Sequence, residues 1–511
     1  MRVSLSGPLD RLAARERIPD FSLSSPTVWL PAVVLVLGGL ALRLQDFYRG
    51  MWEDEITVAY YTQIGIRNVI STVAQNGSHP PLYFLVAATD ARTGLDVLPS
   101  IRIPSVVAGV ATILVVYLIA LKLTGRAGAL VAGTLVMLSP VAVWYSDEGR
   151  MYALVWFFVL TSYLLLVWGH DSPRWRVFAV LHGAAVGLAL WTDYSAALAL
   201  APQIVLIALL SRRRWFLGSW AAGWLTIVPW LFFLHDQYSR IEAQRFPGVG
   251  TDLGSWLAVL SDLVSVHADY ASVDQTLPDA AAALLLLIVG GALVTTVYGA
   301  FNGRLRAATL VACLTAGALA VAVALALQGT VAVILPRVMG IITFGIVFAL
   351  GTAASVLTGF EARVPRLSAA VAAAAVILCF GASGLNVVQN GTNGTEWDTV
   401  ADTISGNAQP GDELIYYPIA AKYAVDPYLA PSSPWRTDYD GAWPKDEGTA
   451  ERSFATWTAG KPRVWFVYLA ITGVDMPTYD LWFAQHNYCR VMGDPFADVG
   501  VMEYQATATH C

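Results

Sequence analysis

The chain has 511 residues, of which 56% are hydrophobic and only 13% charged, and its mean hydropathy is +0.56. These values exclude an ordinary soluble domain and indicate a polytopic membrane protein. The formal net charge of -6 is small, and lysine and arginine form no long tract, so the composition gives no indication of a nucleic-acid partner.

Apolar runs long enough to cross a bilayer recur up to residue 385. Because a hydrocarbon core of roughly 30 Å needs about 20 helical residues, we predict about eleven spans. The predicted spans are residues 27–45, 100–121, 127–145, 151–169, 177–191, 195–211, 215–234, 279–300, 307–327, 338–359 and 367–385. A further apolar run, residues 79–91, would extend only about 20 Å at 1.5 Å per residue, which is too short to span.

The distribution of lysine and arginine predicts the orientation of these spans. If 79–91 stays on the surface, the loops assigned to the cytoplasm hold more lysine and arginine than the outer loops, whereas the excess reverses if 79–91 spans. Since cytoplasmic loops are enriched in these residues, we favour the first topology. It predicts an integral plasma membrane protein with a cytoplasmic N-terminus, an uncleaved signal anchor and an extracytoplasmic C-terminus. Residues 46–99 and 235–278 are then outer loops, the first with short helices along the membrane surface.

The last part of the chain, residues 386–511, differs in composition from the rest. Glycine, proline and aspartate become more frequent, and the β-rich runs "DELIYYPIA", "PRVWFVYLAI" and "VGVMEYQA" alternate with helical stretches such as 396–406. We therefore expect a small extracytoplasmic α/β domain that follows a transmembrane catalytic domain over residues 1–385. Cys489 and Cys511 lie in this region and can form a disulfide if it faces an oxidising compartment.

Ionisable residues gather at the predicted outer ends of four spans, in the stretches "WEDE", "YSDEGRMY", "WTDY" and "LPR". One cavity between helices could collect all four. Transfer of a sugar from a polyprenyl phosphate to an acceptor hydroxyl suits such a set of side chains. A carboxylate can take the proton of the hydroxyl, and arginine can stabilise the departing phosphate. On polarity, Asp54 is the candidate base and Arg150 or Arg337 the candidate phosphate partners.

Six stretches occur in the order of motifs known from one family. "MWEDE" resembles its W-x-D-E motif, "SHPPLYF" its H/K-P-P-L-Y motif and "IRIPSVV" its R-x-P-S helix. "YSDEGRMYAL" resembles Y-S-x-E-x-R-x-Y, "LWTDYSA" the outer end of a later helix, and "LPRVM" a P-R-Y segment. Over most of residues 25–360 the chain resembles the GT-C superfamily of membrane glycosyltransferases, especially protein O-mannosyltransferases and the lipid A aminoarabinose transferase.

The resemblance implies an inverting hexosyl- or pentosyltransferase that uses a polyprenyl-phosphate sugar. Asp54 would be its general base, with Glu55 beside it. The substrate-binding positions implied are His79, Tyr83, Asp147, Glu148, Arg150, Tyr152, Asp193 and Arg337. His79 stands where some relatives have lysine, and Val338 replaces the usual tyrosine after P-R.

The implied partners are the lipid-linked donor, a glycan, lipid or protein acceptor, and the bilayer. We expect no cofactor. Because the related oligosaccharyltransferases bind a divalent metal, metal ligation by "SDEGR" stays an alternative.

Simpler interpretations stand beside these roles. Asp54 and Glu55 could merely begin an interfacial helix, because acidic residues are favourable at helix N-termini. Arg150 could pair with Asp147 or Glu148, and loop 235–278 could bind a substrate or be a solvated connection.

Two other functions are compatible with the sequence. A transporter or flippase of lipid-linked sugars would place ionisable residues near the membrane midplane and often carry internal repeats, and we find few such charges and no evident repeat. A non-catalytic relative would present its outer domain to partner proteins.

Overall fold

The computed structural model describes most of the chain. The described residues are 25–45, 47–92, 94–210, 212–243, 254–256, 263, 279–327, 335–359, 363–390, 396–417, 420–429, 456–469, 476–495 and 499–507. The N-terminal residues of the predicted signal anchor, most of loop 235–278 and Cys511 lie outside this set.

The chain divides into two compact units. The first comprises Met1–Phe47, Ile66–Ala87 and Arg102–Gly391, and the second comprises Tyr48–Gly65, Ala88–Ile101 and Thr392–Cys511. The predicted boundary between a transmembrane domain and an outer domain at residue 385 stays a prediction.

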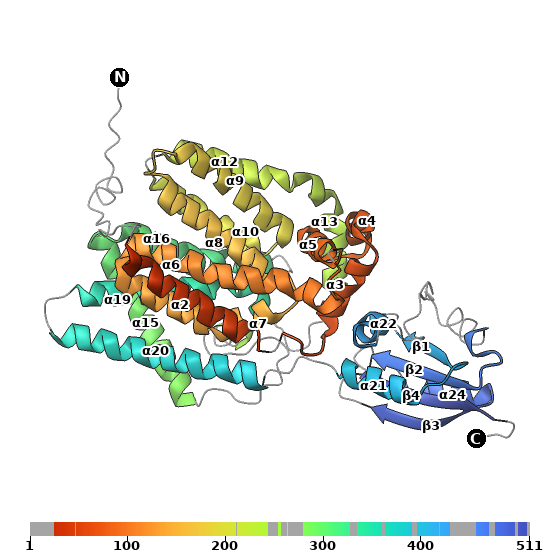
Figure 1. Cartoon of the computed structure of the whole chain (residues 1–511). Coiled ribbons are helices and arrows are strands. Elements are labelled where there is room, and N and C mark those ends of the chain that lie inside the picture. Colours follow the sequence, from red (N-terminus) through yellow and green to blue (C-terminus); the bar gives the residue numbers. More distant parts are fainter. Residues whose placement is uncertain are drawn as a thin grey trace. The chain divides into compact units, whose positions relative to one another are not determined.

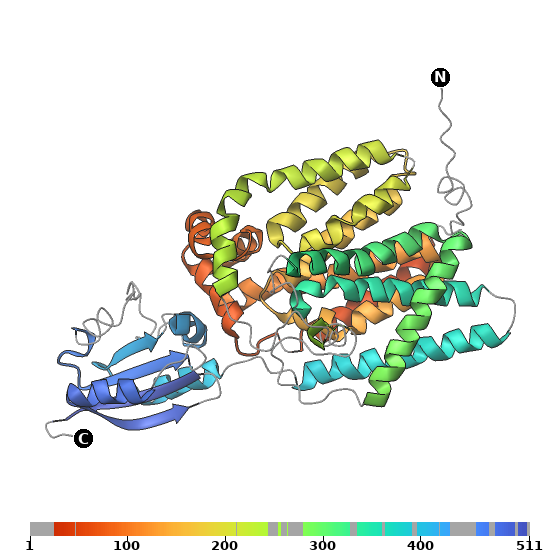
Figure 2. The same cartoon turned by 180° about the vertical axis from the view of Figure 1, so that it is seen from behind.

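The first unit is helical (Figures 1 and 2). The helices up to residue 226 are α2 (Pro26–Arg43), α4 (Ile66–Asn76), α5 (Leu82–Ala91), α6 (Val97–Leu138), α7 (Pro140–Asp147), α8 (Tyr152–Gly169), α9 (Trp175–Thr192), α10 (Ala196–Leu200), α11 (Gln203–Ala208) and α12 (Arg213–Thr226). The end of α5 from Ala88 and the start of α6 up to Ile101 belong to the second unit. Those that follow are η1 (Val228–Phe233), α13 (Leu234–Ala243), α15 (Asp279–Phe301), α16 (Leu305–Ala312), η2 (Cys313–Gly317), α17 (Ala318–Ala326), α18 (Pro336–Met339), α19 (Ile341–Thr358) and α20 (Arg363–Asn390).

Within the described part of the chain, 7 helical stretches are long and apolar enough to cross a membrane. They are Pro26–Arg43, Val97–Leu138, Tyr152–Gly169, Trp175–Thr192, Arg213–Gln237, Leu305–Ala326 and Ile341–Thr358. The structure therefore confirms a polytopic helical protein, whereas the count of about eleven spans stays a prediction. Helix α5 has 10 residues, too few to cross a bilayer.

The predicted spans 100–121 and 127–145 correspond to two helical segments that meet at Gly125. The φ of 79° and ψ of -171° at Gly125 are not helical and suit glycine and few other residues, so α6 is broken there. The two segments lie side by side, because a Cβ on Gly133 would lie 3.4 Å from the Tyr117 ring. The new helix α7 starts at Pro140, where a fixed φ and a missing N–H are tolerated. The Oγ of Ser139 accepts the backbone N–H of Ala142 and caps this start.

The predicted span 195–211 is broken into α10 and α11 at Pro202. Three side chains from other helices donate to backbone carbonyls near the break: Tyr163 to Ala199 (2.7 Å), Trp220 to Leu200 (2.9 Å) and Cys313 to Pro202 (3.2 Å). An apolar interior offers no water to these carbonyls, so the donors stabilise the break. Cys313 begins the π-helical segment η2, so two backbone irregularities pack together.

His182 lies in the middle of α9 and was not singled out from the sequence. Its Nε2 lies 3.1 Å from Gln203 Oε1, and its Nδ1 lies 2.7 Å from Ser219 Oγ. Gln203 in turn donates to Ser162, whose hydroxyl donates to the carbonyl of Val159. Because the amide oxygen of Gln203 can only accept, the imidazole carries a proton on Nε2. The chain of hydrogen bonds joins α8, α9, α11 and α12, as polar residues inside membrane bundles commonly do.

The second unit contains a four-stranded sheet in the order β1-β2-β4-β3. The strands are β1 (Glu413–Tyr417), β2 (Arg463–Leu469), β3 (Tyr488–Pro495) and β4 (Val499–Ala506), and the helices of this unit are α3 (Glu53–Gln63), α21 (Trp397–Asn407), α22 (Ala420–Val425), η4 (Asp426–Tyr428) and α24 (Met476–Gln485). Strands β1 and β2 are parallel, and the other two pairs are antiparallel. The three predicted β-rich runs are confirmed as β1, β2 and β4, and the predicted helix 396–406 as α21.

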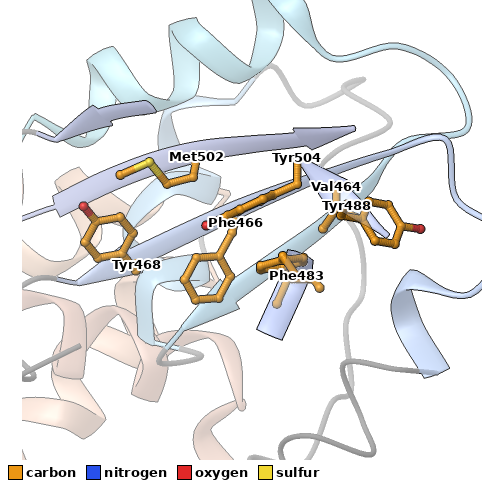
Figure 3. Close-up of a cluster of buried hydrophobic side chains, with 8 residues drawn as sticks. Val464, Phe466, Tyr468, Phe483, Tyr488, Met502 and Tyr504 are labelled. Atoms are coloured by element: carbon orange, nitrogen blue, oxygen red, sulfur yellow. The ribbon is translucent and has the colours of Figure 1, made fainter. Parts of the chain in front are cut away.

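One cluster of buried side chains in this unit lies against one face of the sheet (Figure 3). Phe466 and Phe483 are fully buried there, and Phe483 of α24 stacks on Tyr504 of β4 with ring centroids 3.8 Å apart. Side chains alternate along a strand, so the buried Trp465 points to the opposite face. Its indole donates to Asp412 Oδ2 at 3.0 Å. Cys489 in β3 is disulfide-bonded, whereas Cys313 and Cys379 are free.

Candidate functional site

A pair of ionisable residues far apart in the sequence forms the centre of the site in the first unit. The Nδ1 atom of His79 lies 2.8 Å from Oδ2 of Asp193. Asp193 ends α9, and its other carboxylate oxygen accepts the backbone N–H of Ser195 at 2.8 Å. His79 precedes two prolines that lead into α5. The structure therefore joins the "SHPPLYF" and "LWTDYSA" stretches.

Arg150 reaches the other nitrogen of this imidazole. Its Nη2 lies 3.4 Å from Nε2 of His79, and only 3% of Arg150 is exposed. A guanidinium can only donate, so Nε2 accepts and the imidazole proton is on Nδ1, directed at Asp193. His79 thus bridges an anionic and a cationic side chain within reach of solvent, since a quarter of the His79 side chain is exposed.

A second hydrogen-bond chain fixes the backbone of Arg150. The hydroxyl of Ser105 in α6 donates to the Arg150 carbonyl at 2.7 Å. Because that donor is used, Ser105 accepts from the hydroxyl of Tyr83, which lies 2.7 Å away. Tyr83 and Ser105 are fully buried. Ser105 was not a predicted site residue. It belongs to the R-x-P-S stretch, and this motif could have pointed to it.

The carboxyl group of Asp193 has a lowered pKa. Burial by itself raises the pKa, but the hydrogen bond and charge of His79 and the bonds from Ser195 outweigh it, so the pKa lies below the ordinary value of 3.8. Asp193 is therefore a carboxylate at neutral pH. Burial raises the pKa of the neighbouring Tyr194, whose hydroxyl donates to Gln237 Oε1 at 2.5 Å and accepts from the Trp230 indole at 3.0 Å.

Asp147 and Glu148 are almost completely buried, with 2% and 1% exposure, and lie just before Arg150. Asp147 is close enough to the buried Arg43 of α2 for an electrostatic interaction. The Arg150 backbone N–H donates to the Glu148 carbonyl at 2.8 Å, which closes a tight turn. These two acids are therefore as deeply buried as Arg150, and their part in substrate binding stays a prediction.

An aromatic series leads from Arg150 toward the "LPR" stretch. The Arg150 guanidinium lies 6.0 Å from the ring of Tyr152, and the next ring contacts are Tyr152–Tyr145 (5.2 Å), Tyr145–Trp156 (5.4 Å) and Trp156–Phe344 (5.6 Å). A Cβ on Gly340 would overlap the Trp156 indole, so glycine permits this close packing. Gly340 directly follows α18, which carries the partly exposed Arg337.

The two predicted catalytic acids lie in the second unit, in the first turn of α3. The Glu55 carboxylate is buried and accepts the backbone N–H of Trp52 at 3.4 Å. Glu55 thus stabilises the start of the helix, as the simpler interpretation held for this residue. Asp54 is partly exposed.

The first unit therefore brings together His79, Tyr83, Arg150, Tyr152 and Asp193. Among the described residues, no group of three or more histidine, cysteine, aspartate or glutamate side chains could hold a metal ion. Arg240, Arg245, His267 and Asp269 of loop 235–278 have side chains outside the described set.

The sequence of residues 78–235 matches the family model described as dolichyl-phosphate-mannose-protein mannosyltransferase. This segment contains every contact between His79, Tyr83, Ser105, Arg150 and Asp193. A comparison of the chain with curated proteins gave no match.

The fold is shared with solved structures of low sequence identity. ArnT from Cupriavidus metallidurans in the apo state has a TM-score of 0.55 at 14% identity, over 94% of this chain and 98% of that chain. ArnT from the same organism bound to undecaprenyl phosphate has a TM-score of 0.51 at 14% identity, over 94% of this chain and 98% of that chain. The archaeal oligosaccharyltransferase AglB from Archaeoglobus fulgidus, in complex with an inhibitory peptide and a dolichol-phosphate, gives 0.52 at 13% identity, over 96% of this chain and 75% of that chain. By its fold and by the match over residues 78–235, this membrane protein resembles the GT-C glycosyltransferases, including protein O-mannosyltransferases and ArnT.

Proposed function

We propose that the protein transfers a sugar from a polyprenyl-phosphate donor to an acceptor hydroxyl at the extracytoplasmic face of the membrane. The buried contact of Arg150 with the His79–Asp193 pair, inside the segment that matches the mannosyltransferase family, carries this proposal. The relatives with undecaprenyl phosphate and dolichol-phosphate in their structures support a lipid-phosphate donor.

The chemistry assigns one role to each side chain. The acceptor oxygen attacks the anomeric carbon, the bond from that carbon to the phosphate oxygen breaks, and the electron pair leaves with the polyprenyl phosphate. Asp54 takes the proton of the acceptor hydroxyl as general base. Arg150 and Arg337 offset the charge that grows on the phosphate. A single displacement inverts the configuration at the anomeric carbon.

His79 and Asp193 have a supporting role in this proposal. The lowered pKa of Asp193 keeps its carboxylate charged, and the carboxylate holds the imidazole proton on Nδ1. Nε2 of His79 then accepts from Arg150 and orients the guanidinium. Tyr83 and Ser105 hold the Arg150 backbone in the same place. A disulfide at Cys489 supports an oxidising and therefore extracytoplasmic surrounding for the C-terminal part of the chain.

The test incubates purified protein with a panel of labelled polyprenyl-phosphate sugars and follows donor consumption. We expect the wild type to consume at least one donor, and Asp54→Asn, which keeps the size and removes the charge, to lose transfer by roughly 100-fold or more. Asp402→Asn removes an exposed carboxylate of α21 and is the control, with unchanged transfer. Transfer by correctly folded Asp54→Asn at the wild-type rate would rule out the base, and consumption of no donor by the wild type would rule out the reaction.

A further inference from the structure

Helix α3 starts within the acidic stretch, so the entry of the chain into this helix determines where Asp54 lies. Trp52 precedes the helix with extended backbone, at φ -101° and ψ 172°, and its N–H is accepted by Glu55. Asp54 follows in the first helical turn. A shift of the backbone at residues 51–52 would therefore move Asp54 with it.

The backbone at this point is held by a residue 346 positions away in the sequence. The indole Nε1 of Trp397, at the start of α21, donates to the carbonyl of Met51 at 2.9 Å. Trp397 and Met51 are both fully buried. Without the indole N–H, the buried Met51 carbonyl would lose a partner in a place where water cannot replace it easily.

A second contact fixes the other end of α3. The ring of Tyr60 packs edge-on against the ring of Tyr423 in α22, with centroids 5.1 Å apart. Helices α3 and α22 contact each other, and α22 also contacts α21 and strands β1 and β2. Ala421, Ala424 and Val425 of α22 are fully buried.

We propose that the C-terminal part of the chain is a positioning element of the transfer site, with Trp397 as a positioning residue that acts on Asp54 through the Met51 carbonyl. This inference rests on the proposed function, because it takes Asp54 as the base. It gives the C-terminal sheet and its helices a part in the reaction itself. A misplacement of about 1 Å can cost roughly 100-fold in rate, so a single buried hydrogen bond is enough to matter.

The experiment compares Trp397→Phe with Trp465→Phe in the full-length protein. Both tryptophans are completely buried in the same unit, and each donates one indole hydrogen bond, of 2.9 Å and 3.0 Å. The two variants lose the same N–H group and keep an aromatic ring, but Trp465 donates to Asp412 and not to the segment before α3. Trp465→Phe therefore measures the general effect of such a loss on this unit.

We expect Trp397→Phe to lower kcat by roughly 10-fold to 100-fold with the donor KM unchanged. Hydrogen exchange of the amides of residues 53–63 should become faster in this variant. Trp465→Phe should lower Tm by a similar amount and leave kcat and the exchange of residues 53–63 as in the wild type. Equal kcat values for the two variants would overturn the inference.

A double variant tests whether Trp397 acts through Asp54. If it does, adding Trp397→Phe to Asp54→Asn lowers the residual rate no further. A further loss as large as that of Trp397→Phe alone would mean that the two residues act independently, and would overturn the positioning role. Failure of the proposed function looks different, because the wild type and Trp465→Phe would then also consume no donor.

Discussion

His79 Nδ1 lies 2.8 Å from Asp193 Oδ2, and this contact joins two residues 114 positions apart. It gives the loop before α5 and the end of α9 a common fixed point. The same imidazole contacts Arg150, so the geometry of the proposed phosphate partner depends on the pair.

The pair predicts a pH dependence of stability. The folded-state pKa of Asp193 is depressed below 3.8. Its contribution to the stability of the folded state is therefore present at neutral pH and is lost as the pH falls through the folded-state pKa. Asp193→Asn should cost about 1.5–3 kcal/mol at pH 7 because it removes a buried charged hydrogen-bond acceptor. The Tm difference from the wild type should stay constant from about pH 8 to about pH 5 and shrink below about pH 4. Asp402→Asn should show no such difference, and a difference that already shrinks between pH 8 and pH 5 would contradict the assignment to Asp193.

Tyr83→Phe tests the hydrogen-bond chain that holds the Arg150 backbone. Loss of the hydroxyl should cost about 1 kcal/mol of unfolding free energy and lower kcat/KM for the donor several-fold, because Ser105 and Arg150 become less fixed. Tyr117→Phe is the matched control, since the buried Tyr117 hydroxyl donates to the Val28 carbonyl at 2.8 Å. The control should lose similar stability with unchanged kinetics. Equal donor kcat/KM values for the two variants would show that these hydrogen bonds have no effect on the site.

Arg337→Ala tests the second phosphate partner. We expect the donor KM to rise by roughly 10-fold to 100-fold, because a charged hydrogen bond to phosphate contributes about 1.5–3 kcal/mol. The control is Arg176→Ala, which removes an exposed arginine that stacks over the Trp175 ring at 5.3 Å. Initial rates over a range of donor concentrations give the donor KM of each variant. An unchanged donor KM for Arg337→Ala would remove this residue from the phosphate site.

Gly340→Ala tests the packing that places α18. The added Cβ would overlap the Trp156 indole, so α18 and Arg337 should shift, at a cost of about 1–3 kcal/mol. We expect a lower Tm together with a higher donor KM. Gly290→Ala in α15 meets nothing within 4 Å, so it should neither lower Tm nor raise the donor KM. A Gly340→Ala protein with wild-type Tm and KM would show that the Trp156 contact does not place α18.

Much of the helical organisation can be predicted from the sequence, because hydropathy over about 20 residues reports whether a helix suits a bilayer. Hydropathy does not report backbone hydrogen bonds, so the break at Pro202 inside an apolar run was not predicted, although the proline itself was a signal. Strand β3 was also not predicted. It contains a register shift between Arg490 and Met492, together with Gly493 and Pro495, and these interrupt the alternating pattern of a strand.

For the candidate site, the sequence by itself determined which residue types are present and in which order, because the motifs are local and survive without knowledge of the fold. It could not decide between partners. The sequence suggested Asp147 or Glu148 as a partner of Arg150, and this pairing stays a prediction, whereas only the structure shows the contact with His79, 71 positions away. Likewise Glu55 was grouped with Asp54, and only the structure distinguishes a buried carboxylate at the helix start from a partly exposed one. Only the tertiary structure decides such pairings, because they depend on which helix ends the packing brings together. The spacing of residues in the sequence does not report the distance between helix ends in space.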